Sequence, residues 1–229
     1  MRITFLGHAG FAVETAGALV VMDPWLTPQG AFDSAWMQLP RNHHLAPRVK
    51  ELLETPGKER FLYISHEHKD HFDPEFLATI ARRDFTVLVP KFRRSELRDI
   101  FEKYGCKRVI ACEDSREIPI KGGYIKLFVS EQGTNRDSSV MVRGDGQCFL
   151  NINDCKMHDR LVRVIAEEGP IDVFSAQFSG AIWHPPCYAY DKKQYEVISR
   201  KKMFSKFEAV ARGIEILNPR MFLAAAGPA

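Results

Sequence analysis

The strongest signal in this sequence is the segment Ser65-His66-Glu67-His68-Lys69-Asp70-His71, which follows directly on the apolar run Phe61-Leu62-Tyr63-Ile64. A short apolar run of this kind predicts a buried strand. Residues two apart in extended backbone face the same way, so His66 and His68 project together from the end of the strand. Asp70 can continue on that side, and the following turn can bring His71 beside it.

The chemistry of this segment predicts a metal site. Two imidazoles suit zinc, iron or manganese, and a carboxylate beside a third imidazole can begin a second site. The alternative is a chance cluster of polar residues at a strand end. Four ligand-type residues within six positions argue against chance, although any motif match carries some risk of coincidence. We therefore expect one or two divalent metal ions as the cofactor.

Strands and helices alternate on both sides of this segment. Short apolar or alternating runs predict strands at 3–6, 11–14, 18–22, 61–64, 85–89, 124–129, 139–142, 148–152, 171–175 and 221–225. Helices are predicted at 74–82, 95–104, 158–168 and 192–212. Two β-rich stretches with accompanying helices suggest an α/β fold with two packed sheets, an αββα four-layer sandwich. Periodicity alone does not separate this arrangement from other α/β folds. We expect a single domain over 1–229, and whether the chain is truncated after its last strand stays open.

The pattern His-x-His-x-Asp-His after a hydrophobic strand resembles the metallo-β-lactamase superfamily. This resemblance implies an αββα sandwich of the metallo-β-lactamase type, with His66 and His68 in a first metal site and Asp70 and His71 in a second. It further implies a late aspartate that bridges both metals, and Asp154 after the predicted strand 148–152 has that form. Without the family, Asp154 is equally a turn or N-cap aspartate.

Other segments extend the resemblance over nearly the whole chain. Residues 5–11 and 23–26 resemble the branch that includes ascorbate-6-phosphate lactonase and the phospholipase D that cleaves N-acyl-phosphatidylethanolamine. His8 would then lie near the metal site and Asp23 would support a metal-binding histidine; read alone, His8 is a turn histidine. Residues 137–226 resemble the metallo-β-lactamase half of CMP-N-acetylneuraminate hydroxylase, whose group pairs this fold with a Rieske iron–sulfur domain.

The chain departs from the superfamily pattern at the third ligand of the first site, which is normally a histidine. No histidine occurs between residues 72 and 157. Glu131, close to the end of the predicted strand 124–129, can supply an oxygen there, and we predict it as a ligand. A carboxylate in place of an imidazole favours iron or manganese over zinc. His158 and His184 come late enough for the last ligand of the second site, but neither context matches, so binding of one ion or none stays open.

The segment 24–47 predicts a long, partly ordered loop that leaves an early strand beside the expected metal. Its aromatic and cationic side chains can grip an anionic, ring-bearing substrate. The run 183–188, with Trp183 and His184, can form the opposite wall. A loop that only covers the core is the alternative. The predicted substrate-binding residues are His8, Trp25, Trp36, Arg41 and His184.

Composition limits the partners and the compartment. The formal charge of +3 comes with no basic run or stripe, so we expect no nucleic-acid partner. No apolar stretch approaches the roughly 18 residues of a membrane span, so we expect no membrane partner. The five cysteines are scattered and odd in number, which favours a reducing, cytoplasmic setting over a disulfide framework.

Three functions fit these features. The leading hypothesis is metal-assisted hydrolysis of an ester, lactone or phosphodiester in a small anionic substrate, with Asp70 or Asp154 orienting a water and accepting its proton. The second is the metallo-β-lactamase-fold component of a Rieske-linked hydroxylase that acts on a nucleotide sugar or similar metabolite. Its Rieske domain or protein would be a partner, because this chain lacks the two Cys-x-His half-motifs of such a centre. The third is a degenerate, non-catalytic binding module.

Overall fold

The computed structural model describes residues 1–132, 135–178 and 184–227. The strands of the first sheet are β1 (Arg2–Gly7), β2 (Gly10–Glu14), β3 (Ala18–Met22), β4 (Glu59–Tyr63), β5 (Thr86–Pro90) and β6 (Val109–Cys112). Those of the second are β7 (Glu117–Ile120), β8 (Gly123–Gln132), β9 (Asn135–Gly144), β10 (Gln147–Asn151), β11 (Val173–Gln177) and β12 (Met221–Ala225). The helices are α1 (Ala46–Glu54), α2 (Pro74–Ala78), α3 (Leu97–Lys103), α4 (Leu161–Glu168) and α5 (Lys192–Leu217).

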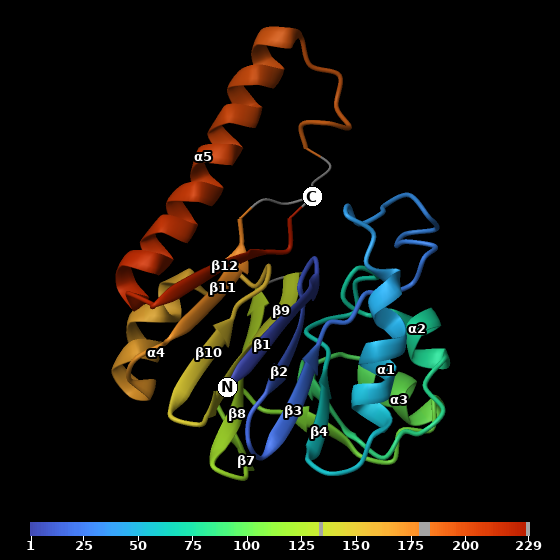
Figure 1. Ribbon diagram of the computed structural model, residues 1–229. Coiled ribbons are helices and arrows are strands. Elements are labelled where there is room, and N and C mark those ends of the chain that lie inside the picture. The colour runs from blue at the N-terminus through green and yellow to red at the C-terminus, as the bar shows by residue number, and fades with distance from the viewer. Residues whose placement is uncertain (133–134, 179–183, 228–229) are drawn as a thin grey trace.

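The two sheets lie face to face, with α1 to α3 outside the first and α4 and α5 on the side of the second (Figure 1). The strand order is β1-β2-β3-β4-β5-β6 in one sheet and β12-β11-β10-β9-β8-β7 in the other. This arrangement confirms the predicted αββα sandwich. None of the helices in the described ranges combines the length and apolarity needed to cross a bilayer.

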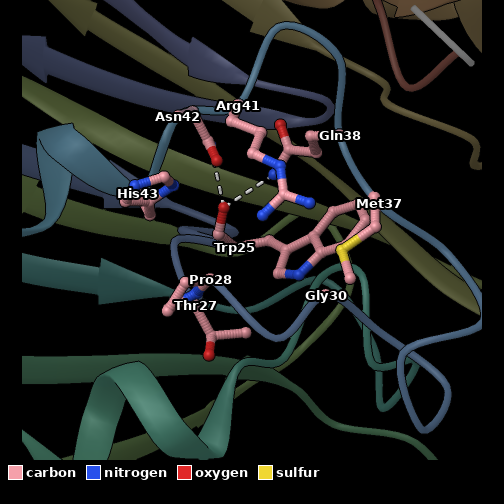
Figure 2. Close-up of a pocket in the computed structure, with 9 residues that line it drawn as sticks. All are labelled: Trp25, Thr27, Pro28, Gly30, Met37, Gln38, Arg41, Asn42 and His43. Carbon is pink, nitrogen blue, oxygen red and sulfur yellow. Dashed lines mark hydrogen bonds between the residues drawn. The ribbon is translucent and has the colours of Figure 1, made fainter.

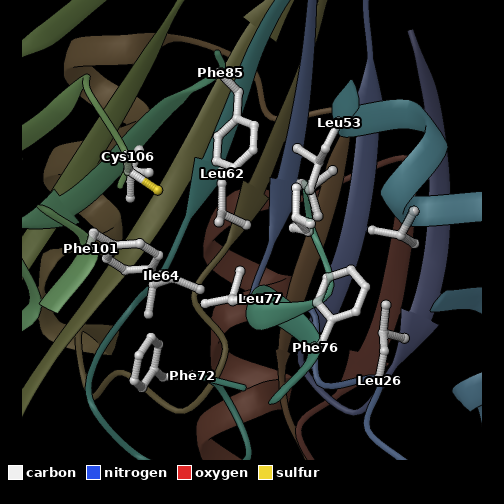
Figure 3. Packing of buried hydrophobic residues seen from close by; sticks show 14 of the residues in the cluster. Leu26, Leu53, Leu62, Ile64, Phe72, Phe76, Leu77, Phe85, Phe101 and Cys106 are labelled. Carbon is white, nitrogen blue, oxygen red and sulfur yellow. The ribbon is translucent and has the colours of Figure 1, made fainter. Parts of the chain in front are cut away.

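The alternation of side chains along β3 shows how the layers form. Leu19 and Val21 belong to the apolar cluster between the first sheet and its helices, where Leu53 and Phe76 also pack (Figure 3). Val20 points the other way, into the cluster between the sheets. Because successive side chains of a strand face opposite sides, an unbroken apolar run can fill two layers at once.

Three elements were not predicted. Helix α1 begins where the predicted loop ends, and the strands β6 and β7 occupy one edge of each sheet. Each of these two strands is only four residues long, which is too short for a clear periodic signal. Helix α5 continues beyond its predicted end to Leu217, where Asn218 adopts a left-handed conformation and caps it.

The strand register decides what meets at one end of the sandwich. Strands β3 and β4 are parallel, and Met22 pairs with Tyr63. The residues after both strands, Asp23 and Ser65, therefore leave the sheet together. The hydroxyl of Tyr63 reaches the facing sheet, where it lies 2.9 Å from the carbonyl oxygen of Ser138 on β9. This contact holds the ends of the two sheets at the same level.

Candidate metal centre

Two chain segments bring one group of ligand-type side chains together. His66 and His68 follow β4, and Asp154 follows β10. One nitrogen of each histidine and one oxygen of Asp154 all lie within 4.8 Å of one another. The two imidazoles converge, with 2.8 Å between Nε2 of His66 and Nδ1 of His68. Two imidazoles and a carboxylate that point into one space can hold a transition-metal ion.

A second group contains His8, Asp70 and His71, all buried, and its ligand atoms also lie within 4.8 Å of one another. Nε2 of His8 is 3.0 Å from Oδ2 of Asp70. Nε2 of His71 is 3.5 Å from the same oxygen. The sequence predicted Asp70 and His71 as metal ligands but placed His8 with the substrate-binding residues. The structure brings His8 among the candidate ligands themselves.

A tight turn between β1 and β2 positions His8. His8 itself has a positive φ of 50°, and the preceding Gly7 has a φ of 102°. A Cβ on Gly7 would lie 2.3 Å from Oε1 of Gln38. Only glycine combines this conformation with so close an approach. The turn therefore depends on Gly7, and it points the His8 ring at Asp70.

Asp154 connects the two groups. Its Oδ1 lies 3.3 Å from Nε2 of His71 in the second group, while the first group also contains Asp154. Three buried atoms, Oδ1 of Asp70, Nε2 of His71 and Oδ1 of Asp154, have no hydrogen-bond partner within the described residues. Buried polar atoms without partners are rare in proteins. Because these three lie in one cluster of ligand-type groups, the donor set fits one or two metal ions.

Asp23 and Ser65 contact the Nδ1 side of the histidine rings. Asp23 is fully buried, and its Oδ2 lies 2.9 Å from Nδ1 of His71. The same carboxylate accepts hydrogen bonds from the backbone N–H and the hydroxyl of Ser65, at 2.8 and 2.6 Å. A carboxylate on Nδ1 fixes the ring and leaves Nε2 available to a metal. The contact is the one that the family resemblance led us to expect for Asp23, and its role in metal binding stays a prediction.

Asp137 on β9 is a site residue that the sequence did not reveal. Its Oδ1 lies 3.2 Å from Nδ1 of His66. Burial and the nearby carboxylate of Asp154 raise the pKa of Asp137 to about 6. Asp137 therefore places a carboxylate beside His66, on the side of the centre where a further ligand was expected, but neither ligand group contains it. Its position early in a strand, with no ligand motif around it, gave no signal in the sequence.

Glu131, the residue predicted for this role, lies at the end of β8. Its Oε1 accepts a hydrogen bond of 3.0 Å from the backbone N–H of Arg93, and its Oε2 is 4.0 Å from Nε of the same residue. No contact within the described residues joins Glu131 to the histidines. The β8–β9 register pairs Glu131 with Arg136, so Asp137 is displaced from it by one strand position and faces the other side.

The cluster has strong internal electrostatics. Burial acts to lower the pKa of His71, but the carboxylates of Asp154, Asp23 and Asp70 outweigh it and raise that pKa well above the ordinary value. Burial acts to raise the pKa of Asp70, yet the hydrogen bond from His8 and the charge of His71 bring it below its usual range. Burial and the neighbouring His66 lower the pKa of His68. Carboxylates and imidazoles thus stabilise one another in place.

The loop residues predicted to bind substrate fall into two sets. The rings of Trp25 and Trp36 lie 5.4 and 5.2 Å from the His8 ring and meet it edge to face. Arg41 shares a surface recess with Trp25 (Figure 2). The structure thus places Trp25 and Trp36 against a residue of the centre and Arg41 beside Trp25.

The late histidines lie elsewhere in the described part of the chain. Nε2 of His184 is 2.7 Å from the hydroxyl of Tyr190, and its carbonyl accepts a hydrogen bond from Nζ of Lys202 on α5. No contact among the described residues connects His184 or His158 with the metal-centre ligands. Trp183, predicted with His184 as a wall of the site, lies outside the described residues.

A face-to-face pair of sheets with a histidine and aspartate cluster at its strand ends defines a metal-binding protein of the metallo-β-lactamase fold. Residues 2–183 match the family described as the Beta-lactamase superfamily domain. The chain belongs to this family, which confirms the superfamily recognised from the His-x-His-x-Asp-His segment.

Curated relatives include both Rieske-associated proteins and hydrolases. A putative Rieske 2Fe-2S iron-sulfur protein of Mycolicibacterium smegmatis is 31% identical over 100% of this chain and 44% of its own length. The cytidine monophosphate-N-acetylneuraminic acid hydroxylase of Mus musculus is 23% identical over 99% of this chain and 39% of its own. UPF0173 metal-dependent hydrolases match at 21–27% identity over 56–76% of this chain. The chain therefore spans less than half the length of the first of these relatives.

Among solved structures, CmlA, a diiron β-hydroxylase from Streptomyces venezuelae, has a TM-score of 0.66 at 20% identity. The similarity covers 98% of this chain and 44% of CmlA. At this identity the match shows the shared fold. The curated relatives thus include metal-dependent hydrolases, a diiron hydroxylase shares the fold, and this chain contains candidate metal-binding groups of histidine and aspartate.

Proposed function

We propose that this chain is the catalytic, metal-binding domain of an enzyme that hydrolyses an ester, lactone or phosphodiester bond in a small anionic substrate. The observation that carries the proposal is the position of Asp154, which contacts the second ligand group and belongs to the first. A carboxylate between two ligand groups suits a two-metal centre. Such centres are common in enzymes that hydrolyse phosphoryl and acyl bonds.

The chemistry that divalent ions supply in such a site is a lowered pKa for water and polarisation of a carbonyl or phosphoryl oxygen. The chain's own residues would complete it. Asp70 and Asp154 each offer a buried oxygen without a hydrogen-bond partner in the described residues, so either can orient a water molecule and accept its proton. Asp23 keeps Nε2 of His71 directed inward through its hydrogen bond to Nδ1.

Metal analysis combined with a hydrolase assay panel tests this proposal. Wild type, His68→Ala and the control His44→Ala are purified identically, and metal content and turnover of ester, lactone and phosphodiester substrates are measured. His44 is an exposed histidine outside the ligand groups. We expect His68→Ala to lose metal and activity while His44→Ala retains both. Equal activity in wild type and His68→Ala would refute hydrolysis at this centre, and metal-free wild type would favour the non-catalytic binding module.

A second candidate function is the metal-binding component of a Rieske-linked hydroxylase. It is favoured by relatives named as Rieske iron–sulfur proteins, which match this chain over its whole length. Each described ligand group combines two imidazoles with one carboxylate, a ligand set that non-haem iron sites use. A Rieske domain or protein would then be the electron-transfer partner. Iron in the purified protein would support this function, as would a coding sequence for a Rieske domain that continues from this chain or lies next to it. Zinc as the only bound metal, together with full hydrolytic turnover, would exclude it.

We also propose a reducing, cytoplasmic compartment for the chain. All five cysteines are free thiols, and Cys106, Cys112, Cys148 and Cys155 are buried. Buried thiols without disulfide partners are typical of proteins in reducing compartments. Fractionation of the source cells with an antibody against the chain tests this, and recovery in an oxidising extracellular fraction would contradict it.

A further inference from the structure

Helix α5 exposes apolar side chains on the side that is turned away from the sandwich. Its C-terminal part packs on the protein through buried residues that include Val210 and Leu217. Val197, Phe204 and Phe207 are nevertheless 62%, 54% and 47% exposed. A helix on the surface of a globular protein normally has polar residues on its outward face. Several exposed apolar side chains on one helix therefore indicate a face that a partner covers.

The opposite side of α5 is held against the second sheet. A Cβ on Gly213 would lie 3.1 Å from the ring of Phe174 on β11, so the helix approaches this strand closely. One turn and a half earlier, Nζ of Lys206 donates a hydrogen bond to Oε1 of Gln177 at the end of β11. The N-terminal turns of α5 then extend beyond the end of the sandwich (Figure 1). The helix is thus fixed along one side, and the exposed apolar side chains stand on the other.

The exposed side follows a heptad pattern. Stripe positions recur at alternating intervals of four and three residues, and this α5 stripe consists of Lys193, Val197, Arg200, Phe204, Phe207, Ala211 and Ile214. All of these residues are exposed except Ile214, which is partly buried. Residues at this spacing lie along one face of a helix, and the repeat is typical of helices that pair with another helix. The pattern therefore indicates a helical partner.

We propose that the α5 stripe binds the α5 stripe of a second copy of this chain, with the two helices antiparallel. The register that places Phe204 of each copy against Phe207 of the other brings four phenylalanines together at the middle of the helix. In the same register Arg200 lies beside the small Ala211 of the second copy, which leaves room for the longer side chain. Pairing removes the exposed phenyl rings from water, and this burial drives the association.

The charges beside the stripe favour a second copy in this antiparallel register. Lys201 and Glu208 are exposed, and each follows a stripe position by one residue, so both lie along the same edge of the stripe. The register places Lys201 opposite Glu208 of the second copy, and two-fold symmetry forms this ion pair twice. A parallel pair would instead set Arg200 against Arg200 and Lys193 against Lys193. Such like-charge contacts destabilise a helix pair.

Analytical ultracentrifugation of the whole chain at increasing concentration tests the self-association. We expect a monomer–dimer equilibrium whose dissociation constant rises about a hundredfold or more in Phe204→Ser, because each dimer loses two central rings. Tyr195→Ser is the matched control, since Tyr195 is an exposed aromatic residue of α5 outside the stripe. Circular dichroism confirms that both variants fold. A chain that is monomeric at every concentration would overturn the proposal and leave the stripe to a further segment of a longer protein.

A charge exchange tests the register and the identity of the partner. Lys201→Glu and Glu208→Lys should each weaken dimerisation about tenfold, because each replaces two symmetry-related ion pairs by like-charge contacts. The double variant restores opposite charges on both copies and should regain the wild-type dissociation constant. Recovery of this kind requires that the partner carries the same two substitutions, so it identifies a second copy in the antiparallel register. Double-variant dimerisation as weak as that of the single variants would overturn the proposed pairing.

Discussion

Nε2 of His8 lies 3.0 Å from Oδ2 of Asp70, although 62 residues separate the two in the chain. Both side chains are buried, and the Trp25 and Trp36 rings cover His8 from the loop side. The contact joins the first β-turn of the chain to the end of the metal-binding segment. Through this contact, His8 in the β1–β2 turn belongs to the second ligand group itself.

Replacing His8 should therefore change the metal content of the protein. We expect His8→Ala to lose one of two bound ions, since the second group would keep only Asp70 and His71 of its own. Metal-to-chain ratios after dialysis measure the effect. His184→Ala is the matched control, because His184 contacts Tyr190 instead of the centre. An unchanged ratio in His8→Ala would show that His8 is not a ligand.

Replacing Asp23 tests the support behind His71. In Asp23→Asn the side chain keeps its size but loses the negative charge of the carboxylate that accepts a hydrogen bond from Nδ1 of His71. Partners of this kind typically contribute about 10–100-fold to metal affinity, and we expect a loss of that order. Competition with a chromogenic chelator measures it, with the exposed Asp33→Asn as control. An affinity equal to that of wild type would assign Asp23 a purely structural role.

A pair of substitutions distinguishes Asp137 from Glu131. We expect Asp137→Asn to weaken metal binding, because Asp137 lies 3.2 Å from Nδ1 of His66. Glu131→Gln should leave metal binding unchanged, because the Glu131 carboxylate is engaged with Arg93. Metal titrations of both variants, with circular dichroism to confirm folding, give the comparison. The reverse result would restore Glu131 as the ligand.

The buried thiols predict a loss of stability at alkaline pH. Burial raises the pKa of Cys112 from 9.0 to about 12, and the pKa of Cys148 by as much. Above pH 9 these thiols ionise in the unfolded chain but stay protonated in the folded one. The stability that is present below pH 9 therefore declines toward pH 12, by about 1.4 kcal/mol per pH unit for each such thiol.

Denaturant unfolding between pH 7 and pH 10.5 under reducing conditions measures this decline. This pH range brackets the pKa of an ordinary thiol, roughly 8.5–9. Cys112→Ala should show a shallower decline than wild type. It should also be less stable at neutral pH, since a buried group is removed. Cys187→Ala, at an exposed thiol, should follow the wild-type slope. Identical slopes for Cys112→Ala and wild type would contradict the proposed ionisation.

The sequence determined the fold through patterns that lie within short segments and can be recognised without knowing which segments contact one another. The apolar run 61–64 followed by His66, His68, Asp70 and His71 carries both a buried strand and four ligand-type groups. The αββα sandwich followed from that motif and from the alternation of strands and helices. The edge strands β6 and β7 escaped prediction because each has only four residues, too few to show a period.

Only the tertiary structure decided which distant side chains meet at the strand ends. Strand register brings Asp23 to Ser65, and the facing sheet brings Asp137 to His66. A one-residue shift along a strand turns a side chain to the opposite face, and spacing in the sequence does not reveal which residue faces the centre. For this reason the sequence determined the kind of site. The packing of the two sheets determined that Asp137 and His8 contact its residues, whereas Glu131 and His184 contact Arg93 and Tyr190 instead.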